Sequence, residues 1–292
     1  MNIVRVNSGL GNQMFQYALF RALYAKSSDT KMDIFSFKYR TFHNGYELEK
    51  IFNIQPVYAT QKECDKLADV SKNIWAEIRR KVFKVRLKTT GNFVEEGDLG
   101  VFFHPEILTM KDTYFSGFWQ TEKYFKDIES QLRHDFTFKQ PLDDANLKIK
   151  QKIDACDSVS IHIRRGDYIK PSRAHILNTC TQVYYERAIA YISQQVMNPV
   201  FFFFSDDIDW VKENFRMPHA EYVNINSGTD SYKDMQLMSC CKHNIIANSS
   251  FSWWGAWLNA RKEKIVLTPS VWSRNIDTPN IVPDHWLKIE IE

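Results

Sequence analysis

The second half of the chain alternates short apolar runs with amphipathic helical patterns, and this alternation restricts the fold more than any other feature. Strands are predicted at residues 158–163, 200–204, 222–225, 243–247 and 264–268. Helices are predicted between them at residues 181–196, 207–215, 230–241 and 251–260. Such an alternation folds into a parallel sheet with helices on both faces, the doubly wound arrangement. The predicted fold class is therefore α/β.

The first half gives a weaker pattern. Strands are predicted there at residues 3–6, 32–35 and 114–119, and helices at residues 13–26 and 122–136. Residues 41–103 show no clear periodicity. The acidic, polar segment at residues 139–157 is the predicted boundary between two domains, which we place at residues 1–150 and 151–292.

Composition and charge exclude several classes of protein. With 44% hydrophobic and 14% aromatic residues among 292, the chain is neither disordered nor of low complexity. Its net charge of +3 is too small to indicate a nucleic-acid partner. Five cysteines without a C-x-x-C spacing form neither a zinc motif nor a disulfide framework, which favours a reducing compartment.

The N-terminal sequence MNIVRVNSGLGNQ lacks the apolar stretch of a signal peptide, and the strongest apolar run, at residues 200–204, is too short to span a membrane. We therefore expect a cytoplasmic protein. The basic stretch at residues 79–88 (RRKVFKVRLK) leaves open a peripheral association with the inner face of an anionic membrane. The alternative is a helix whose charged face is simply solvated.

Clusters of polar residues follow three of the predicted strands in the second half. They are His162, Arg164, Arg165, Gly166 and Asp167 after the first strand, Ser205, Asp206 and Asp207 after the second, and Asn248, Ser249, Ser250, Phe251 and Ser252 after the fourth. Because the carboxyl ends of parallel strands lie at one edge of a sheet, we expect the three clusters to converge on one ligand. Guanidinium groups and hydroxyls that open a helix bind phosphate, while carboxylates bind ribose or a base.

Each of these clusters also has a purely structural interpretation. Arg164 and Arg165 could form an ion pair with Asp167, but two adjacent arginines at the end of a buried strand favour ligand binding. Arg165, Gly166 and Asp167 also spell the adhesion tripeptide, which carries little weight without a secretion signal. Residues 248–250 could serve only as a helix N-cap, a role compatible with presenting free N–H groups to a phosphate.

Three tryptophans and a D-x-D pair also have structural interpretations. Trp253, Trp254 and Trp257 have helical spacing and are expected in the core. Asp207 and Asp209 form a pair of the kind that can hold a metal beside a pyrophosphate. We interpret Asp209 instead as a residue of a helical first turn, where acids are favoured by the helix dipole.

A glycine turn near the N-terminus begins like a dinucleotide-binding fingerprint. Gly9 and Gly11 have the required spacing, but Met14 stands where the third glycine belongs. We expect this turn to present the amides of Asn12 and Gln13 towards a cleft between the domains.

Several long segments resemble the bacterial α-1,2-fucosyltransferases of glycosyltransferase family 11. They are SGLGNQMFQYALFRAL from Ser8, GFWQTEKYF from Gly117, HIRRGDY from His162, FSDD from Phe204 and DMQLMSCCKHNIIANSSFSWWGAWLN from Asp234. The resemblance runs from Val6 to about Thr268. It implies a GT-B architecture of two facing Rossmann-like domains, the first on the acceptor side and the second binding GDP-fucose. It also implies that no metal or other cofactor is required.

The activity implied by the resemblance is the inverting transfer of L-fucose from GDP-β-L-fucose to the 2-hydroxyl of a galactose-terminated glycan, in surface polysaccharide synthesis. Arg164 would contact the β-phosphate, His162 would lie near the guanine and Asp234 would read the guanine. Residues 249–252 would bind phosphate, with Phe251 packed near the nucleotide.

The full set of expected site residues combines these roles with the motif analysis. Catalysis is assigned to Arg164, Arg165 and Asp167, with Asp167 expected to orient the two arginines. Donor binding is assigned to His162, Asp206, Asp207, Asp234, Asn248, Ser249, Ser250, Phe251, Ser252, Gly9, Gly11, Asn12 and Gln13. No motif identifies the general base. Two alternatives stay open: a GT-B transferase that uses another nucleotide sugar, and a GDP-binding protein without catalytic activity.

Overall fold

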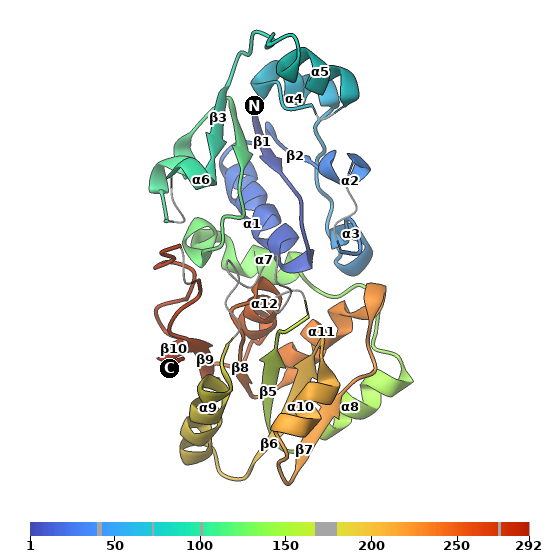
Figure 1. Cartoon of the computed structure of the whole chain (residues 1–292), viewed down its shortest axis with the longest axis vertical. Helices are drawn as coiled ribbons and strands as arrows, with labels where there is room; N and C mark the ends of the chain where they lie inside the picture. Colours follow the sequence, from blue (N-terminus) through green and yellow to red (C-terminus); the bar gives the residue numbers. More distant parts are fainter. Residues whose placement is uncertain (40–42, 72, 100–101, 167–179, 274–275, 292) are drawn as a thin grey trace. The chain divides into compact units, whose positions relative to one another are not determined.

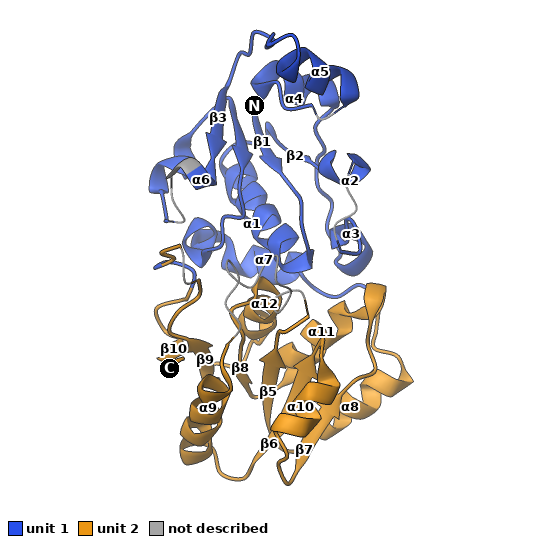
Figure 2. Cartoon of the chain, viewed as in Figure 1, with its two compact units in different colours: residues 1–139, 279–281 blue, residues 140–278, 282–292 orange. Residues whose placement is uncertain are grey.

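The chain forms two compact units, each built around its own parallel β-sheet (Figures 1 and 2). The computed structural model describes residues 1–292 except 40–42, 72, 100–101, 167–179, 274–275 and 292. Unit 1 consists of Met1–Lys139 with Pro279–Ile281, and unit 2 of Gln140–Thr278 with Val282–Glu292. The predicted α/β class, with the two parallel-sheet units of a GT-B architecture, is confirmed.

The sheet of unit 1 has the strand order β2-β1-β4-β3, with all neighbours parallel. Its strands are β1 (Asn2–Arg5), β2 (Thr30–Asp33), β3 (Asn92–Glu95) and β4 (Thr113–Ser116). In the central strand β1, the consecutive residues Ile3 and Val4 are both fully buried. Burial on both faces is typical of a parallel strand covered by helices on each side.

Unit 1 has helices of very different length. They are α1 (Leu10–Lys26), α2 (Ser36–Tyr39), α3 (Leu48–Ile51), α4 (Gln61–Ala68), α5 (Ile74–Lys81), α6 (Glu96–Leu99) and α7 (Glu129–Asp135). The long helix α1 packs on β1 and β2, whereas α4 packs on β3 and β4. Thr60 begins α4 with a capping box, in which its hydroxyl accepts from the Glu63 N–H and the Glu63 side chain accepts from the Thr60 N–H.

The sheet of unit 2 has the strand order β10-β9-β8-β5-β6-β7, also with all neighbours parallel. Its strands are β5 (Asp157–Ile163), β6 (Pro199–Ser205), β7 (Ala220–Val223), β8 (His243–Ile245), β9 (Val266–Pro269) and β10 (Leu287–Ile289). The seven residues of β5 pair one to one with the seven of β6, from Asp157 opposite Pro199 to Ile163 opposite Ser205. This pairing places the ends of both strands at the same level.

The helices of unit 2 are α8 (Asp144–Asp154), α9 (Gln182–Gln195), α10 (Ile208–Asn214), α11 (Tyr232–Cys240) and α12 (Ser250–Leu258). Thr181 caps α9 by accepting from the Tyr184 N–H. The buried rings of Tyr184 and Tyr185 belong to the same core cluster as Val159 and Phe203. Trp253, Trp254 and Trp257 of α12 are buried, so their predicted place in the core is confirmed.

Two predictions about the fold need correction. The helix predicted at residues 122–136 is instead two 3₁₀ turns, Glu122–Tyr124 and Lys126–Ile128, followed by α7. Phe125 interrupts it because its backbone is not helical (φ −131°) while its ring is buried. The boundary lies after Lys139 rather than at residue 150, since α8 packs on β5 and α11. The sequence pattern also missed β3, α8 and β10.

The described helices include none that is both long enough and apolar enough to cross a membrane. The cysteines, all within the described residues, are free thiols.

Candidate functional site at the carboxyl edge of the unit 2 sheet

The structure brings the three predicted clusters of unit 2 to one edge of the sheet. β5 lies between β6 and β8, and the three strands are parallel, so their carboxyl ends point to the same side. The first cluster begins at His162, among the last residues of β5, and the others follow the ends of β6 and β8 at Asp206 and Asn248. Asp167, which was expected to orient the arginines, lies outside the described residues.

Two carboxylates at the end of β6 hold the two arginines at the end of β5. Nη1 of Arg164 lies 2.8 Å from Oδ2 of Asp206, and Nε of Arg165 donates to Oδ2 of Asp207 at 3.1 Å. The second oxygen of Asp206 accepts from the Arg165 N–H at 2.9 Å. All four side chains are only partly buried. Asp206 and Asp207 thus make the orienting contacts that the sequence analysis expected of Asp167.

Close packing further restricts this strand-end turn. The Arg165 guanidinium stacks on the Trp210 ring, 3.7 Å from its centroid. A Cβ atom at Gly166 would lie only 2.6 Å from Oδ2 of Asp206, so any larger residue there would force this carboxylate to shift. The arginines are therefore fixed before any ligand arrives.

His162 contributes a buried polar atom to this edge of the sheet. Within the described residues its Nδ1 has no hydrogen-bond partner, and its ring lies 5.7 Å from that of Phe251 between centroids. Burial lowers the pKa of His162 well below its usual value, although Asp206 acts in the opposite direction. The imidazole is therefore neutral near pH 7. A buried donor or acceptor without a partner is costly, and a ligand at this edge could satisfy it.

The N-terminus of α12 supplies backbone N–H groups at the same edge. Ser249 is the N-cap with an extended backbone, and its side chain makes no capping hydrogen bond. Asn248 donates to the Trp272 carbonyl at 3.0 Å, which fixes the turn before the helix. The buried Ser252 hydroxyl donates to the carbonyls of Ala247 and Ser249, so Ser252 has no hydroxyl proton for a phosphate. The first turn offers an anion its backbone N–H groups.

Asp234 lies in a network of amides beyond the end of β7. Nδ2 of Asn226 donates to Oδ1 of Asp234 at 2.7 Å, and Asn226 and Asn146 exchange side-chain hydrogen bonds at 2.8 and 2.9 Å. Burial raises the pKa of Asp234 to about 7, partly offset by the Asn226 hydrogen bond. Neither Asn226 nor Asn146 is among the site residues predicted from the sequence. The only signal for Asn226 was its place directly after the strand predicted at residues 222–225.

The D-x-D pair is separated in the structure. Asp207 bonds Arg165 and precedes α10, whereas Asp209 lies in the first turn of α10 and pairs with Lys212 at 3.5 Å. The predicted helix start is confirmed. In the described part of the chain no three His, Cys, Asp or Glu side chains gather as a metal site would require.

The glycine turn of unit 1 opens α1 with Gly9 as N-cap. The buried carboxamide of Gln13 donates to the carbonyls of Ser8 and Gly45 and accepts from the Glu47 N–H. Its hydrogen bonds are all made within unit 1, so the expectation that Gln13 offers its amide to a ligand needs correction. The Asn12 amide also contacts the chain itself, since its Oδ1 accepts from Gln120 at 2.6 Å.

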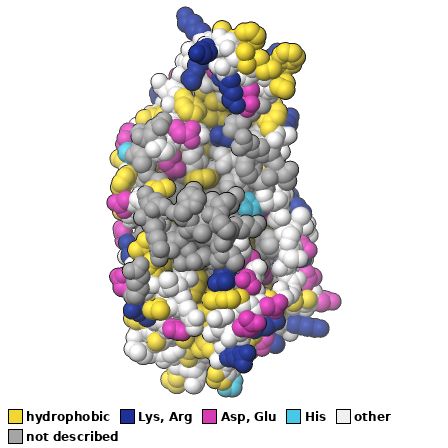
Figure 3. Space-filling view, viewed as in Figure 1, with side chains coloured by type: hydrophobic (Ala, Val, Ile, Leu, Met, Phe, Trp, Pro, Cys, Tyr) yellow, Lys and Arg dark blue, Asp and Glu magenta, His cyan; other side chains and the backbone are white. Residues whose placement is uncertain are grey.

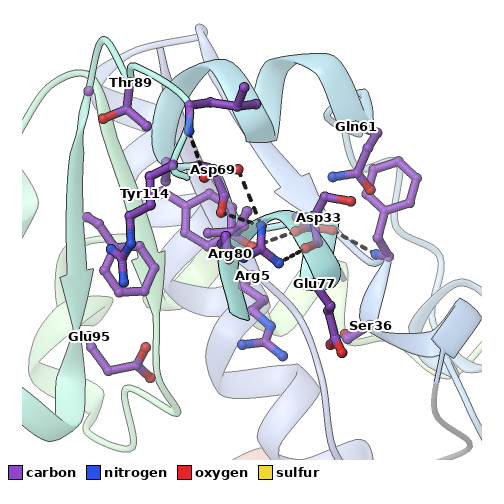
Figure 4. A pocket seen from close by; sticks show the side chains of 18 of the residues that line it. Arg5, Asp33, Ser36, Gln61, Asp69, Glu77, Arg80, Thr89, Glu95 and Tyr114 are labelled. Atoms are coloured by element: carbon purple, nitrogen blue, oxygen red, sulfur yellow. Dashed lines mark hydrogen bonds and ion pairs between the residues drawn. The ribbon is translucent and has the colours of Figure 1, made fainter. Parts of the chain in front are cut away.

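A separate cavity of about 510 Å³ lies in unit 1 (Figure 4). The half-exposed ring of Phe93 stacks on that of Tyr114, with centroids 5.9 Å apart and planes 18° from parallel. Polar groups surround this pair: Tyr114 donates to Asp33, while Arg5 and Glu95 both contact the Ser116 hydroxyl. None of the predicted donor-site residues lines the cavity.

Comparison with known proteins supports the assignment of a class. The sequence model of glycosyl transferase family 11 matches residues 102–289. The chain is 36% identical to an alpha-1,2-colitosyltransferase of Escherichia coli, covering 99% of this chain and 98% of that protein. It is 26% identical to galactoside alpha-(1,2)-fucosyltransferase 1 of Ateles belzebuth, covering 49% and 42%. A crystal structure of NodZ alpha-1,6-fucosyltransferase soaked with GDP-fucose matches 88% of this chain and 91% of that chain, with a TM-score of 0.46 and 13% identity.

The match to the family model and the 36% identity to the Escherichia coli relative over nearly the whole chain make the protein a glycosyltransferase. Within that class the chain belongs to glycosyl transferase family 11.

Proposed function

We propose that the protein transfers L-fucose from GDP-β-L-fucose to the 2-hydroxyl of a terminal galactose, with inversion at the anomeric carbon. The observation that carries the proposal is the pair of oriented guanidinium groups at the carboxyl edge of the unit 2 sheet, the edge at which α12 begins without a side-chain cap. This combination is suited to a diphosphate, because it joins two fixed cations to a set of backbone N–H donors.

Inversion requires a single displacement, and the transition state then resembles an oxocarbenium ion. Negative charge grows on the departing GDP as the glycosidic bond breaks. Arg164, Arg165 and the N–H groups of α12 would stabilise that charge, at roughly 3 kcal/mol for each preorganised donor. Asp206 and Asp207 hold the arginines in place, so little reorganisation is needed during the reaction.

The guanine of the donor would be read by Asp234. An ionised carboxylate accepts two hydrogen bonds from the N1–H and the exocyclic amine of guanine, and adenine offers no such donor pair. Among the described residues, Oδ1 of Asp234 accepts one hydrogen bond, from Asn226, and Oδ2 accepts none, so both oxygens keep a lone pair for the base. His162 and Phe251, one ring apart, would pack near the same nucleotide.

The acceptor glycan would bind in the cavity of unit 1. An exposed aromatic face offers apolar contact to a sugar ring, and charged groups around it offer hydrogen bonds to hydroxyls. Phe93 supplies the aromatic face. Arg5 supplies hydrogen-bond donors and Glu95 supplies acceptors. Replacing Phe93 with alanine would then raise the KM for the acceptor and leave that for the donor unchanged.

A second candidate donor is GDP-colitose. It is favoured by the relative with 36% identity over nearly the whole chain, whose name specifies alpha-1,2-colitosyl transfer. The two donors would share the diphosphate and guanine contacts and differ only around the sugar.

The test is to incubate the protein with GDP-fucose or GDP-colitose and a panel of galactose-terminated glycans, and to identify the linkage of the product. An α-1,2-fucosylated product supports the proposal, and exclusive use of GDP-colitose supports the second candidate. Binding of GDP without product from either donor would contradict both and favour a non-catalytic GDP-binding protein. The Arg164→Ala variant controls for contaminating activity.

A further inference from the structure

α5 and the segment that follows it expose large apolar side chains to solvent. We name this surface the α5 patch, defined by Ile74, Trp75, Val82, Phe83, Val85 and Leu87. Trp75 is 77% exposed and Phe83 68% exposed. Isolated exposed apolar residues are common, but six within one short stretch of chain mark an interaction surface.

Cations alternate with these apolar side chains along the chain. The segment from residue 74 to 88 contains six Lys or Arg residues and a single carboxylate, Glu77. Residues 81–90 are all exposed. Lys84, Arg86 and Lys88 have no ion-pair partner in the part of the chain that the structure describes. Figure 3 shows dark blue and yellow side chains together at the end of unit 1 that carries α4 and α5.

The α5 patch is held in place by a buried carboxylate behind it. Asp69, at the end of α4, pairs with Arg79 and Arg80 and accepts from the Leu87 N–H at 3.0 Å. Arg79 also donates to the Val85 carbonyl at 2.9 Å. These bonds fix the backbone on both sides of Phe83. They involve Arg79 and Arg80 but not the lysines and the arginine that follow Phe83. Lys84 and Lys88, which do not line the unit 1 cavity, are therefore available to a partner.

We propose that the α5 patch is a docking surface for an anionic lipid bilayer. Aromatic and aliphatic side chains enter the boundary between headgroups and acyl chains, while the long lysine and arginine side chains keep their charges at the lipid phosphates. A protein partner fits less well, because the cores of protein interfaces are depleted in lysine and keep charge at the rim. Here apolar and basic residues alternate from one position to the next between Phe83 and Lys88.

The test is co-sedimentation of the full-length protein with vesicles of phosphatidylcholine alone or mixed with phosphatidylglycerol. We expect at least about tenfold tighter binding to the anionic vesicles, decreasing with added salt. Two double variants separate the contributions. Trp75→Ser with Phe83→Ser removes the apolar anchors, and Lys84→Glu with Lys88→Glu reverses the charge. Each is expected to reduce binding to anionic vesicles by about tenfold or more.

The matched control is Met197→Ser with Lys262→Glu, an exposed apolar residue and an exposed lysine on unit 2, which should bind vesicles like the wild type. All variants change exposed side chains, so their melting temperatures and their transfer to a soluble acceptor should stay unchanged. This keeps the outcome separate from that of the proposed function. No preference for anionic vesicles, or equal binding by the patch variants and the wild type, would overturn the proposal. Loss of a dimer in the Trp75→Ser, Phe83→Ser variant, without any lipid binding, would show instead that the patch joins two copies of the chain.

Discussion

Arg164 is the residue on which the proposed chemistry most depends, because its guanidinium is held at the strand end by Asp206. We expect Arg164→Ala to reduce kcat/KM by at least about 100-fold, the effect of losing one strong electrostatic donor to the leaving group. The partly exposed position of the side chain means that the fold should be unaffected. Steady-state kinetics and circular dichroism measure the two effects.

Arg216→Ala provides the matched control for this variant. Arg216 is exposed on unit 2 between α10 and the amino end of β7, whereas the candidate site lies at the carboxyl ends of the strands. Activity of Arg164→Ala within a few-fold of the wild type would reject the role of Arg164 and make Arg165 the candidate.

Asp234 is the second residue with a specific expectation. The proposed guanine contact requires an ionised carboxylate, and its pKa in the unliganded protein is raised to about 7. GDP affinity should therefore fall about tenfold per pH unit as the pH decreases below 7. GDP should inhibit the wild type far better than ADP does. Asp234→Ala should reduce the ratio of the two inhibition constants, and the ratio for Asp234→Asn should lie between those of the wild type and Asp234→Ala. Inhibition constants across the pH range, for GDP and ADP, measure both effects.

The same carboxyl predicts the pH dependence of stability. The pKa of Asp234 in the folded protein is above the usual 3.8. Between about pH 4 and 7 this carboxyl is therefore protonated more in the folded than in the unfolded chain. The contribution of Asp234 to stability is therefore largest at low pH and falls as the pH rises through this window. Asp234→Asn should remove that fall in melting experiments. If Asp234→Ala lowers the melting temperature but leaves the ratio of the GDP and ADP inhibition constants unchanged, Asp234 has only a structural role in α11.

At the scale of elements, Gly166 allows the turn after β5 to lie close to the Asp206 carboxylate. Gly166→Ala would bring a Cβ atom to 2.6 Å from the Asp206 carboxylate, which must then move away from Arg164. We expect a loss of transfer of about tenfold to 100-fold, since small displacements of an oriented group have large effects on rate. Gly97→Ala is the control, because a Cβ atom there meets nothing within 4 Å. Equal activity of the two variants would show that the turn tolerates the displacement.

Helix α12 joins the site to the core, and its tryptophans determine its stability. Trp253 is fully buried and contacts the rings of Trp254, Trp257 and Trp286. Trp253→Ala should lower the free energy of unfolding by about 3–5 kcal/mol. Trp75→Ala, at the exposed start of α5, should change it by less than about 0.5 kcal/mol. Denaturant titration of both variants makes the comparison, and similar losses would contradict the assignment of Trp253 to the core.

At the scale of the whole molecule, we expect the proposed reaction to use the chain's own cations and helix N–H groups in place of a metal. Asp207 and Asp209 are each paired with a cation of unit 2, Arg165 and Lys212. Treatment with EDTA should therefore leave the rate of transfer largely unchanged. A strict requirement for added manganese or magnesium would show that the D-x-D pair holds a metal during catalysis after all.

The sequence by itself determined the α/β class, most strand and helix positions of unit 2, and the edge of the sheet where the polar clusters gather. These features follow from local periodicity and from the rule that parallel strands end on one side. The same reasoning placed the tryptophans of α12 in the core and the start of α10 near Asp207.

Only the tertiary structure decided which groups contact one another. The pairing of Arg164 with Asp206, and of Asp234 with Asn226, depends on strand neighbours and loop paths that no local pattern encodes. Gln13 is committed to the loop at Gly45 and Glu47 for the same reason. Hydrogen bonds between residues distant in sequence form only when the sheet order is set, and that order results from packing of the whole unit.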